Sequence, residues 1–156
     1  VLGFTLDIEI FTLAHYRSSI EGEGGLSPLW QDVFLFHWKE ESQHAILDEL
    51  EWLREDARLT PVQRDAAVDD LIALVGAVDG ILQVQSKADV DYFVSILARE
   101  LSSDEVDGLH AAVLKAYRWQ YIGSGVQEPR FQQVLGSLID DAQSARIGQA
   151  LAPLVA

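Results

Sequence analysis

The stretch that decides the fold is FLFHWKEESQH, residues 34–44. An α-helix turns by about 100° per residue, so His37, Glu41 and His44 share a line only about 60° wide on the helix surface. Asp48 continues the same line. The residues before these polar groups are large and apolar, which is typical of a buried helix and not of a solvated one. The stretch therefore predicts a helix that carries several potential metal ligands into the protein interior.

Helix signals continue on the amino-terminal side. Ser27–Pro28 is a favourable start, with a capping hydroxyl followed by proline at the first helical position, and it predicts a helix over about residues 28–55. The apolar residues 1–20 predict the helix before it, and the acidic, glycine-rich residues 21–25 predict the loop between the two. Two consecutive helices joined by a short loop form an antiparallel pair.

The carboxyl-terminal side repeats the same signals and predicts further helices over about residues 61–150. Thr60–Gln63 is a capping box, and the helix that follows either runs on or breaks near Ser86. Ser102–Glu105 opens another helix, which we expect to stop at Gly123–Gly125. Pro129 starts a last helix or a pair of short helices.

These signals together predict an all-α, up-down helical bundle that forms a single domain over residues 1–156. Strand signals are nearly absent, since alternation of apolar and polar residues never persists. The 49% content of apolar residues is enough for a packed core. The apolar start at Val1 and the absence of methionine favour a segment of a longer polypeptide.

The charge balance narrows the classes of partner. The chain has 11 basic against 25 acidic side chains and a formal charge of −14, which argues against nucleic acid and anionic membrane surfaces. No apolar run reaches the ~20 residues of a membrane span, and no secretory signal is present. We therefore expect a cytoplasmic protein. The chain contains no cysteine, so a metal would have to be held by His, Asp or Glu.

Glu41 and His44 have the spacing at which a carboxylate and an imidazole on one helix bind the same ion. Imidazole shifts the preference of such a site toward Fe, Mn or Zn. Glu9 lies among apolar residues of the first helix and is the natural acid to join them. Asp7 lies about 200° from Glu9 on the helix, and we expect it to face water. The alternative interpretation is a seam of salt bridges and hydrogen bonds between helices.

This pattern resembles the ferritin-like di-iron carboxylate superfamily over about residues 6–53. Glu9 followed by Glu41-x-x-His44 matches one half of that pattern, and the further His37 resembles the arylamine N-oxygenase branch. The resemblance implies two iron ions, with manganese or zinc as alternatives, and O₂ activation for oxidation or oxygenation. It further implies that Glu9 bridges or caps one ion, Glu41 bridges two, His44 binds terminally and His37 is an additional ligand.

The second half of the family pattern is missing. Asp107 and His110 have the right spacing but a shorter acid, and they lie close to the start of their helix. Asp91 is the acid that could join them. A surface location for this pair is the favoured interpretation. Two hypotheses follow: a degenerate second half made of these residues, or a missing half upstream of Val1.

The apolar residues Trp30, Phe34 and Trp38 beside the ligands indicate a small apolar or aromatic substrate. The leading hypothesis is thus a di-iron oxidoreductase or oxygenase. One alternative is a non-enzymatic acidic bundle that serves as an oligomerisation module, and another is iron storage or buffering. In each case we expect a homo-oligomer.

Overall fold

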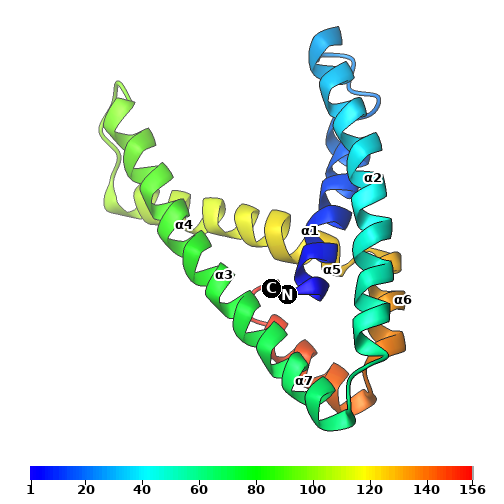
Figure 1. The fold of residues 1–156 in the computed structure, drawn as a ribbon. Coiled ribbons are helices and arrows are strands. Elements are labelled where there is room, and N and C mark those ends of the chain that lie inside the picture. The colour runs from blue at the N-terminus through cyan, green and yellow to red at the C-terminus, as the bar shows by residue number, and fades with distance from the viewer. Residues whose placement is uncertain (156) are drawn as a thin grey trace.

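The computed structural model describes residues 1–155, and all of its regular elements there are helical. Two long hairpins dominate (Figure 1). The first joins α1 (Leu2–His15) to α2 (Pro28–Asp56), and the second joins α3 (Pro61–Ile96) to α4 (Ser103–Arg118). The all-α helical bundle that the sequence predicts is confirmed.

Five shorter elements complete the chain. A π-helical turn, η1 (Tyr16–Ile20), extends α1, and a second, η2 (Trp119–Gly123), extends α4 into the one-turn helix α5 (Ser124–Val126). Two short helices follow, α6 (Pro129–Leu138) and α7 (Asp141–Leu151). Pro129 therefore opens a pair of short helices, one of the two outcomes that the sequence left open.

The helix starts have the caps that the sequence predicts. The Ser27 hydroxyl accepts a hydrogen bond from a backbone N–H of α2, and Thr60 and Ser102 each take part in a reciprocal capping box. The break considered near Ser86 does not occur, because α3 is continuous and the Ser86 hydroxyl donates to the Gln83 carbonyl at 3.1 Å. Local chemistry thus fixes where these helices begin.

The glycines at 123–125 do not end the fourth helix. The prediction that they do is wrong, since the helical path continues through η2 and α5 to Val126. Gly125 instead allows α5 to pack closely against α1. A Cβ atom on it would lie 2.5 Å from the backbone oxygen of Asp7, so only glycine lets α5 approach α1 this closely.

The core lies where α1, α2 and α6 meet. Its buried side chains come from all three helices, and Trp52 and Leu53 of α2 pack against them from the rim. The cluster consists of Leu6, Ile10, Ala45, Phe131 and Val134. Because this core holds α1 firmly against α2, it fixes which residues of the two helices face each other.

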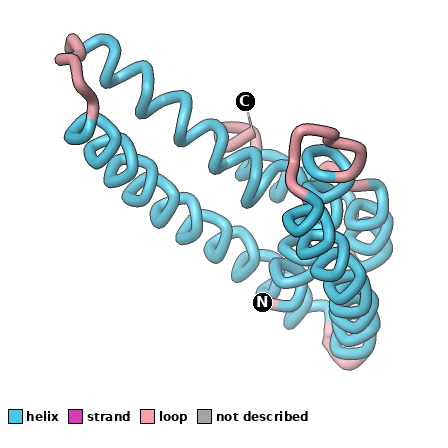
Figure 2. The backbone as a smooth tube through the Cα atoms, turned by 90° about the horizontal axis from the view of Figure 1, so that it is seen from above, coloured by secondary structure: helices cyan, strands magenta, loops and turns pink. Residues whose placement is uncertain are grey.

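The two hairpins diverge from the region where they join. Figure 1 shows them as the two arms of a V, and Figure 2 shows from above that the α3–α4 hairpin extends away from the other helices. Large parts of α2 and α3 consequently have no helix packed on their outer sides. Among residues 1–155, no helix combines the length and the apolar character needed to cross a membrane.

Candidate metal centre

Glu9 of α1 meets Glu41 and His44 of α2 across the first hairpin. One ligand atom from each of the three side chains lies within 4.8 Å of the other two. The carboxylates are mostly buried, whereas the His44 side chain is half exposed. The structure therefore brings together three of the four residues that the sequence favours as metal ligands.

Glu41 is the central residue of this group. Its Oε2 lies 2.7 Å from His44 Nδ1, and its Oε1 lies 2.7 Å from His37 Nε2. Each oxygen thus faces a different imidazole. His37 contacts the group only through Glu41, lies on its outer side and is half exposed.

The two nitrogens of His44 have different surroundings. Nδ1 faces the group, at 2.7 Å from Glu41 and 4.0 Å from Glu9 Oε2. Nε2 lies 3.1 Å from Glu40 Oε1 on the other side of the ring. A metal-binding histidine commonly donates its second N–H to a carboxylate, which fixes the orientation of the ring. Glu40 is not among the residues that the sequence predicts at the site, although its four-residue separation from His44 is a sequence signal for this contact.

The crowded carboxylates titrate abnormally. Burial raises the pKa of Glu9 to about 7, and the neighbouring Glu41 carboxylate adds to this shift. Burial alone would raise the pKa of Glu41 too, but hydrogen bonds with Glu9 and His44 hold it below its usual value. The hydrogen bond with Glu41 raises the pKa of His44. Without a cation, the group therefore holds a proton on Glu9 below about pH 7.

The donor set fits a transition metal. Two carboxylates and one imidazole suit Fe, Mn or Zn better than Mg or Ca, which prefer oxygen ligands alone. A cation would also replace the proton that Glu9 otherwise holds. In the part of the chain that the structure describes, this is the one group of three or more such side chains close enough to share an ion.

Asp107 and His110 lie far from this group in the fold, on the second hairpin. Asp107 is exposed, and His110 Nε2 lies 3.8 Å from Asp91 Oδ1 across α3 and α4. Asp91 in turn binds Lys87 at 2.9 Å. The structure thus does not bring Asp107 and His110 to Glu41 and His44.

Asp7 does not face water, so that prediction is wrong. Its relative exposure is 2%, because α5 covers the side of α1 opposite Glu9 and Gly125 packs directly on Asp7. Burial raises the pKa of the Asp7 carboxyl to about 8. Helix periodicity correctly put Asp7 on the side of α1 opposite Glu9. It could not show that α5, which is distant in the sequence, would cover that side.

A small cavity lies beside the centre. It has a volume of about 130 Å³, and Phe34, His37 and Trp38 are among the residues that line it. Tyr16 stacks on Trp38, whose buried indole N–H has no hydrogen-bond partner among residues 1–155. Trp30, the third residue that the sequence placed at a substrate pocket, packs on Phe34 outside this lining.

Comparisons with known proteins add no family assignment. No protein-family model matches the chain, and no match was found among curated proteins or solved structures.

Proposed function

We propose that this protein is a metal-dependent oxidoreductase whose centre is held by Glu9, Glu41 and His44. The single observation that carries the proposal is the convergence of these three ligand atoms within 4.8 Å across two helices. Both carboxylates are partly buried and close together, so that without a cation they have to share a proton. A bound cation removes that conflict.

The contacts of Glu41 support a pair of ions. Because its two oxygens face His44 and His37 respectively, Glu41 would help to hold one ion together with His44 and Glu9 and a second together with His37. Glu40 orients the His44 ring from outside. The resemblance to di-iron carboxylate proteins favours iron in both positions, and a bound iron pair would supply O₂ activation for substrate oxidation or oxygenation.

The adjacent cavity supports a small aromatic substrate. Its volume of about 130 Å³ is similar to that of an apolar cavity of ~150 Å³ that holds benzene. Phe34 and Trp38 provide apolar walls for such a substrate. His37 lies in the same wall, so a substrate bound there is next to the centre.

The outer side of α2 supports a homo-oligomer. Along this side, seven residues follow one another at alternating spacings of four and three. Five of them are apolar and more than half exposed, and the two polar ones, Glu40 and Gln43, lie in the middle of the series. We call this set the α2 stripe; its apolar members are Leu29, Val33, Phe36, Leu47 and Leu50. Such a spacing is the signature of a helix that packs against another helix.

The spacing within the α2 stripe indicates a second copy as the partner. From Val33 to Leu50 the order of spacings is the same in both chain directions. Apolar residues lie at both ends of this segment, and a polar pair lies at its centre. An antiparallel second α2 would therefore set apolar ends opposite apolar ends and Glu40 opposite Gln43. His37 and His44 lie on α2 between the stripe and the side covered by α1, so this second copy would close the open side of the centre.

Metal titration tests the proposal. The purified protein should bind iron(II) stoichiometrically, and binding should raise its melting temperature, since a ligand of the folded state stabilises that state. Glu41→Ala and His44→Ala should abolish both effects while the circular dichroism remains helical. His15→Ala is the matched control, because it removes an imidazole of the same hairpin that packs on Phe34 outside the group.

Two results would separate the alternatives. No metal uptake, together with an unchanged melting temperature in EDTA, would identify the acidic oligomerisation module. Uptake of many iron ions per chain, with no oxidation of an added aromatic substrate, would identify iron storage.

A further inference from the structure

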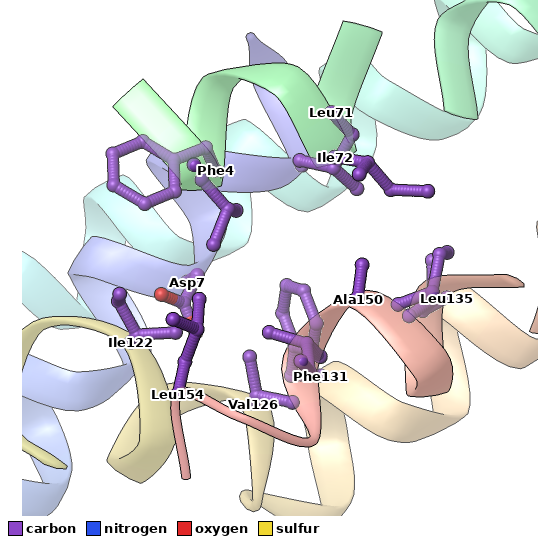
Figure 3. A pocket seen from close by; sticks show the side chains of 15 residues that line it. Phe4, Asp7, Leu71, Ile72, Ile122, Val126, Phe131, Leu135, Ala150 and Leu154 are labelled. Carbon is purple, nitrogen blue, oxygen red and sulfur yellow. The ribbon is translucent and has the colours of Figure 1, made fainter. Parts of the chain in front are cut away.

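A second and larger cavity lies on the other side of α1 from the metal centre. Its volume is about 230 Å³, and it is enclosed by α1, α3, α6 and α7 together with the segment that includes Ile122 and Val126 (Figure 3). Of the 15 residues that line it, Asp7 alone has a polar side chain. The cavity is therefore an apolar chamber with one hydrogen-bonding group in its wall.

Asp7 is unusual in this setting. Its relative exposure is 2%, and its Oδ1, which lies against Gly125, has no hydrogen-bond partner among the described residues. Figure 3 shows it between Phe4 and Ile122, at one end of the chamber. Buried polar groups are nearly always hydrogen-bonded, because losing water without gaining a partner is costly. An unpaired carboxyl group in an otherwise apolar wall points to a partner that comes from outside the chain.

We propose that this cavity binds a small apolar molecule that ends in a hydroxyl group, such as an alkylphenol, with the hydroxyl at Asp7. A hydroxyl both donates and accepts, so it pairs with the carboxyl group whether or not that group carries a proton. The apolar remainder of the molecule lies against Phe4, Phe131 and their neighbours.

The volume sets the size of the ligand. About 230 Å³ exceeds the ~150 Å³ of an apolar cavity that holds benzene, and it is below the ~300–1,000 Å³ typical of drug-sized ligands. One aromatic ring with a hydroxyl and a short alkyl chain matches this space.

This site does not depend on the metal centre. No residue of the Glu9, Glu41 and His44 group lines the chamber, and Asp7 and Glu9 point to different sides of α1. Binding can therefore be measured with metal-free protein, and its outcome is separate from that of the metal titration.

The test compares 4-ethylphenol with 4-ethylanisole, its methyl ether, by isothermal titration calorimetry on the full chain at about pH 9, where Asp7 is a carboxylate and can only accept a hydrogen bond. The two molecules share the ring and the ethyl group, but the ether cannot donate a hydrogen bond. We expect saturable binding of one 4-ethylphenol per chain and about tenfold weaker binding of the ether. Asp7→Leu should reduce the affinity for the phenol to about that for the ether.

Two glycines of α3 provide a matched pair of variants. A Cβ atom at Gly76 or at Gly80 would meet no atom within 4 Å, so a side chain can be added at either position without displacing the backbone. Only Gly76 lines the chamber. Gly76→Leu should fill it and abolish binding of 4-ethylphenol, whereas Gly80→Leu, one turn further along the helix, should leave binding unchanged.

Three results would overturn the proposal. One is the absence of saturable binding up to the solubility limit of the phenol. Another is equal affinity for the phenol and the ether, since Asp7 would then have no role. The last is unchanged binding in Gly76→Leu, which would put the phenol elsewhere. If Asp7→Leu does not fold, the glycine pair still decides the location and the ether still decides the role of the carboxyl group.

Discussion

At the scale of single residues, the centre depends on how Glu41 is placed. Its carboxylate is the only group that contacts both His37 and His44 among the residues described, and each imidazole lies 2.7 Å from a different oxygen. Glu9 joins from the neighbouring helix and completes the group. Other side chains around the centre contact these ligands without belonging to the ligand group.

In the proposed metal centre, Glu40 is such a positioning residue. Glu40→Gln should weaken iron(II) binding by about 10- to 100-fold, because the amide no longer holds the His44 N–H as a charged acceptor does. A chelator competition assay measures this change. Asp32→Asn, another exposed acid of α2, is the control and should have no effect. Equal affinities of Glu40→Gln and the unaltered protein would show that His44 needs no such support.

Asp7 should make the fold sensitive to alkali. Its pKa is about 8 in the folded protein against 3.8 for an ordinary aspartate, so the folded chain holds a proton that the unfolded chain releases between these values. The free energy of unfolding should therefore fall as the pH rises from about 4 through 8. Glu9 contributes in the same direction, but only up to about pH 7.

Asp7→Asn separates the two contributions, because it removes one titrating group and keeps the size of the side chain. Chemical denaturation between pH 7 and pH 8 should show a smaller loss of stability for this variant than for the unaltered protein. Parallel stability curves over that interval would contradict the assignment.

At the scale of elements, α3 and α4 are fastened by a charged pair. Arg118 donates from Nε and from a terminal nitrogen to the buried Asp79 carboxylate, at 2.6 and 3.0 Å. The Arg118 hydrogen bond lowers the pKa of Asp79, so the carboxylate stays charged. Tyr117 adds a second link by donating its hydroxyl hydrogen to Asp89 at 2.5 Å.

Breaking this pair on one side should be costly. Arg118→Leu should destabilise the protein by about 3 kcal/mol, since it leaves a buried carboxylate without its partner. Adding Asp79→Leu to the same chain should restore most of the loss, because the unpaired charge is then gone. Urea denaturation of the single and double variants measures both effects. A double variant as unstable as Arg118→Leu would mean that packing, and not charge, holds the two helices together.

At the scale of the whole molecule, the divergence of the two hairpins determines which helix surfaces stay exposed. It leaves the α2 stripe without a covering helix and leaves His37 and His44 half exposed. A second copy that packs along the stripe would bury apolar surface and cover the centre in the same step.

Light scattering coupled to size exclusion tests this arrangement. The unaltered chain should elute as a dimer, and Phe36→Glu or Leu47→Glu should give monomers, because a charge would then be buried in the interface. Ile46→Glu is the matched control, since Ile46 is 62% exposed like Leu47 at 61% but lies about 100° away from it on the helix. A monomeric unaltered chain, or a dimer that persists in Leu47→Glu, would remove the α2 stripe as the interface.

The sequence by itself determined the all-α class and the starts of α2, α3, α4 and α6, and it singled out Glu9, Glu41 and His44. These features are local: a cap acts over three residues, and ligands three or four residues apart on one helix share a face whatever surrounds it. Glu9 could be added because consecutive helices joined by a short loop pack against each other.

Only the tertiary structure decided which of these faces are covered. Asp7 is buried because α5, more than 110 residues further along the chain, crosses α1 at Gly125. Asp107 and His110 are kept away from Glu41 because their hairpin diverges from the first. Contacts between distant segments depend on how every helix packs at once, and helix periodicity carries no information about that packing.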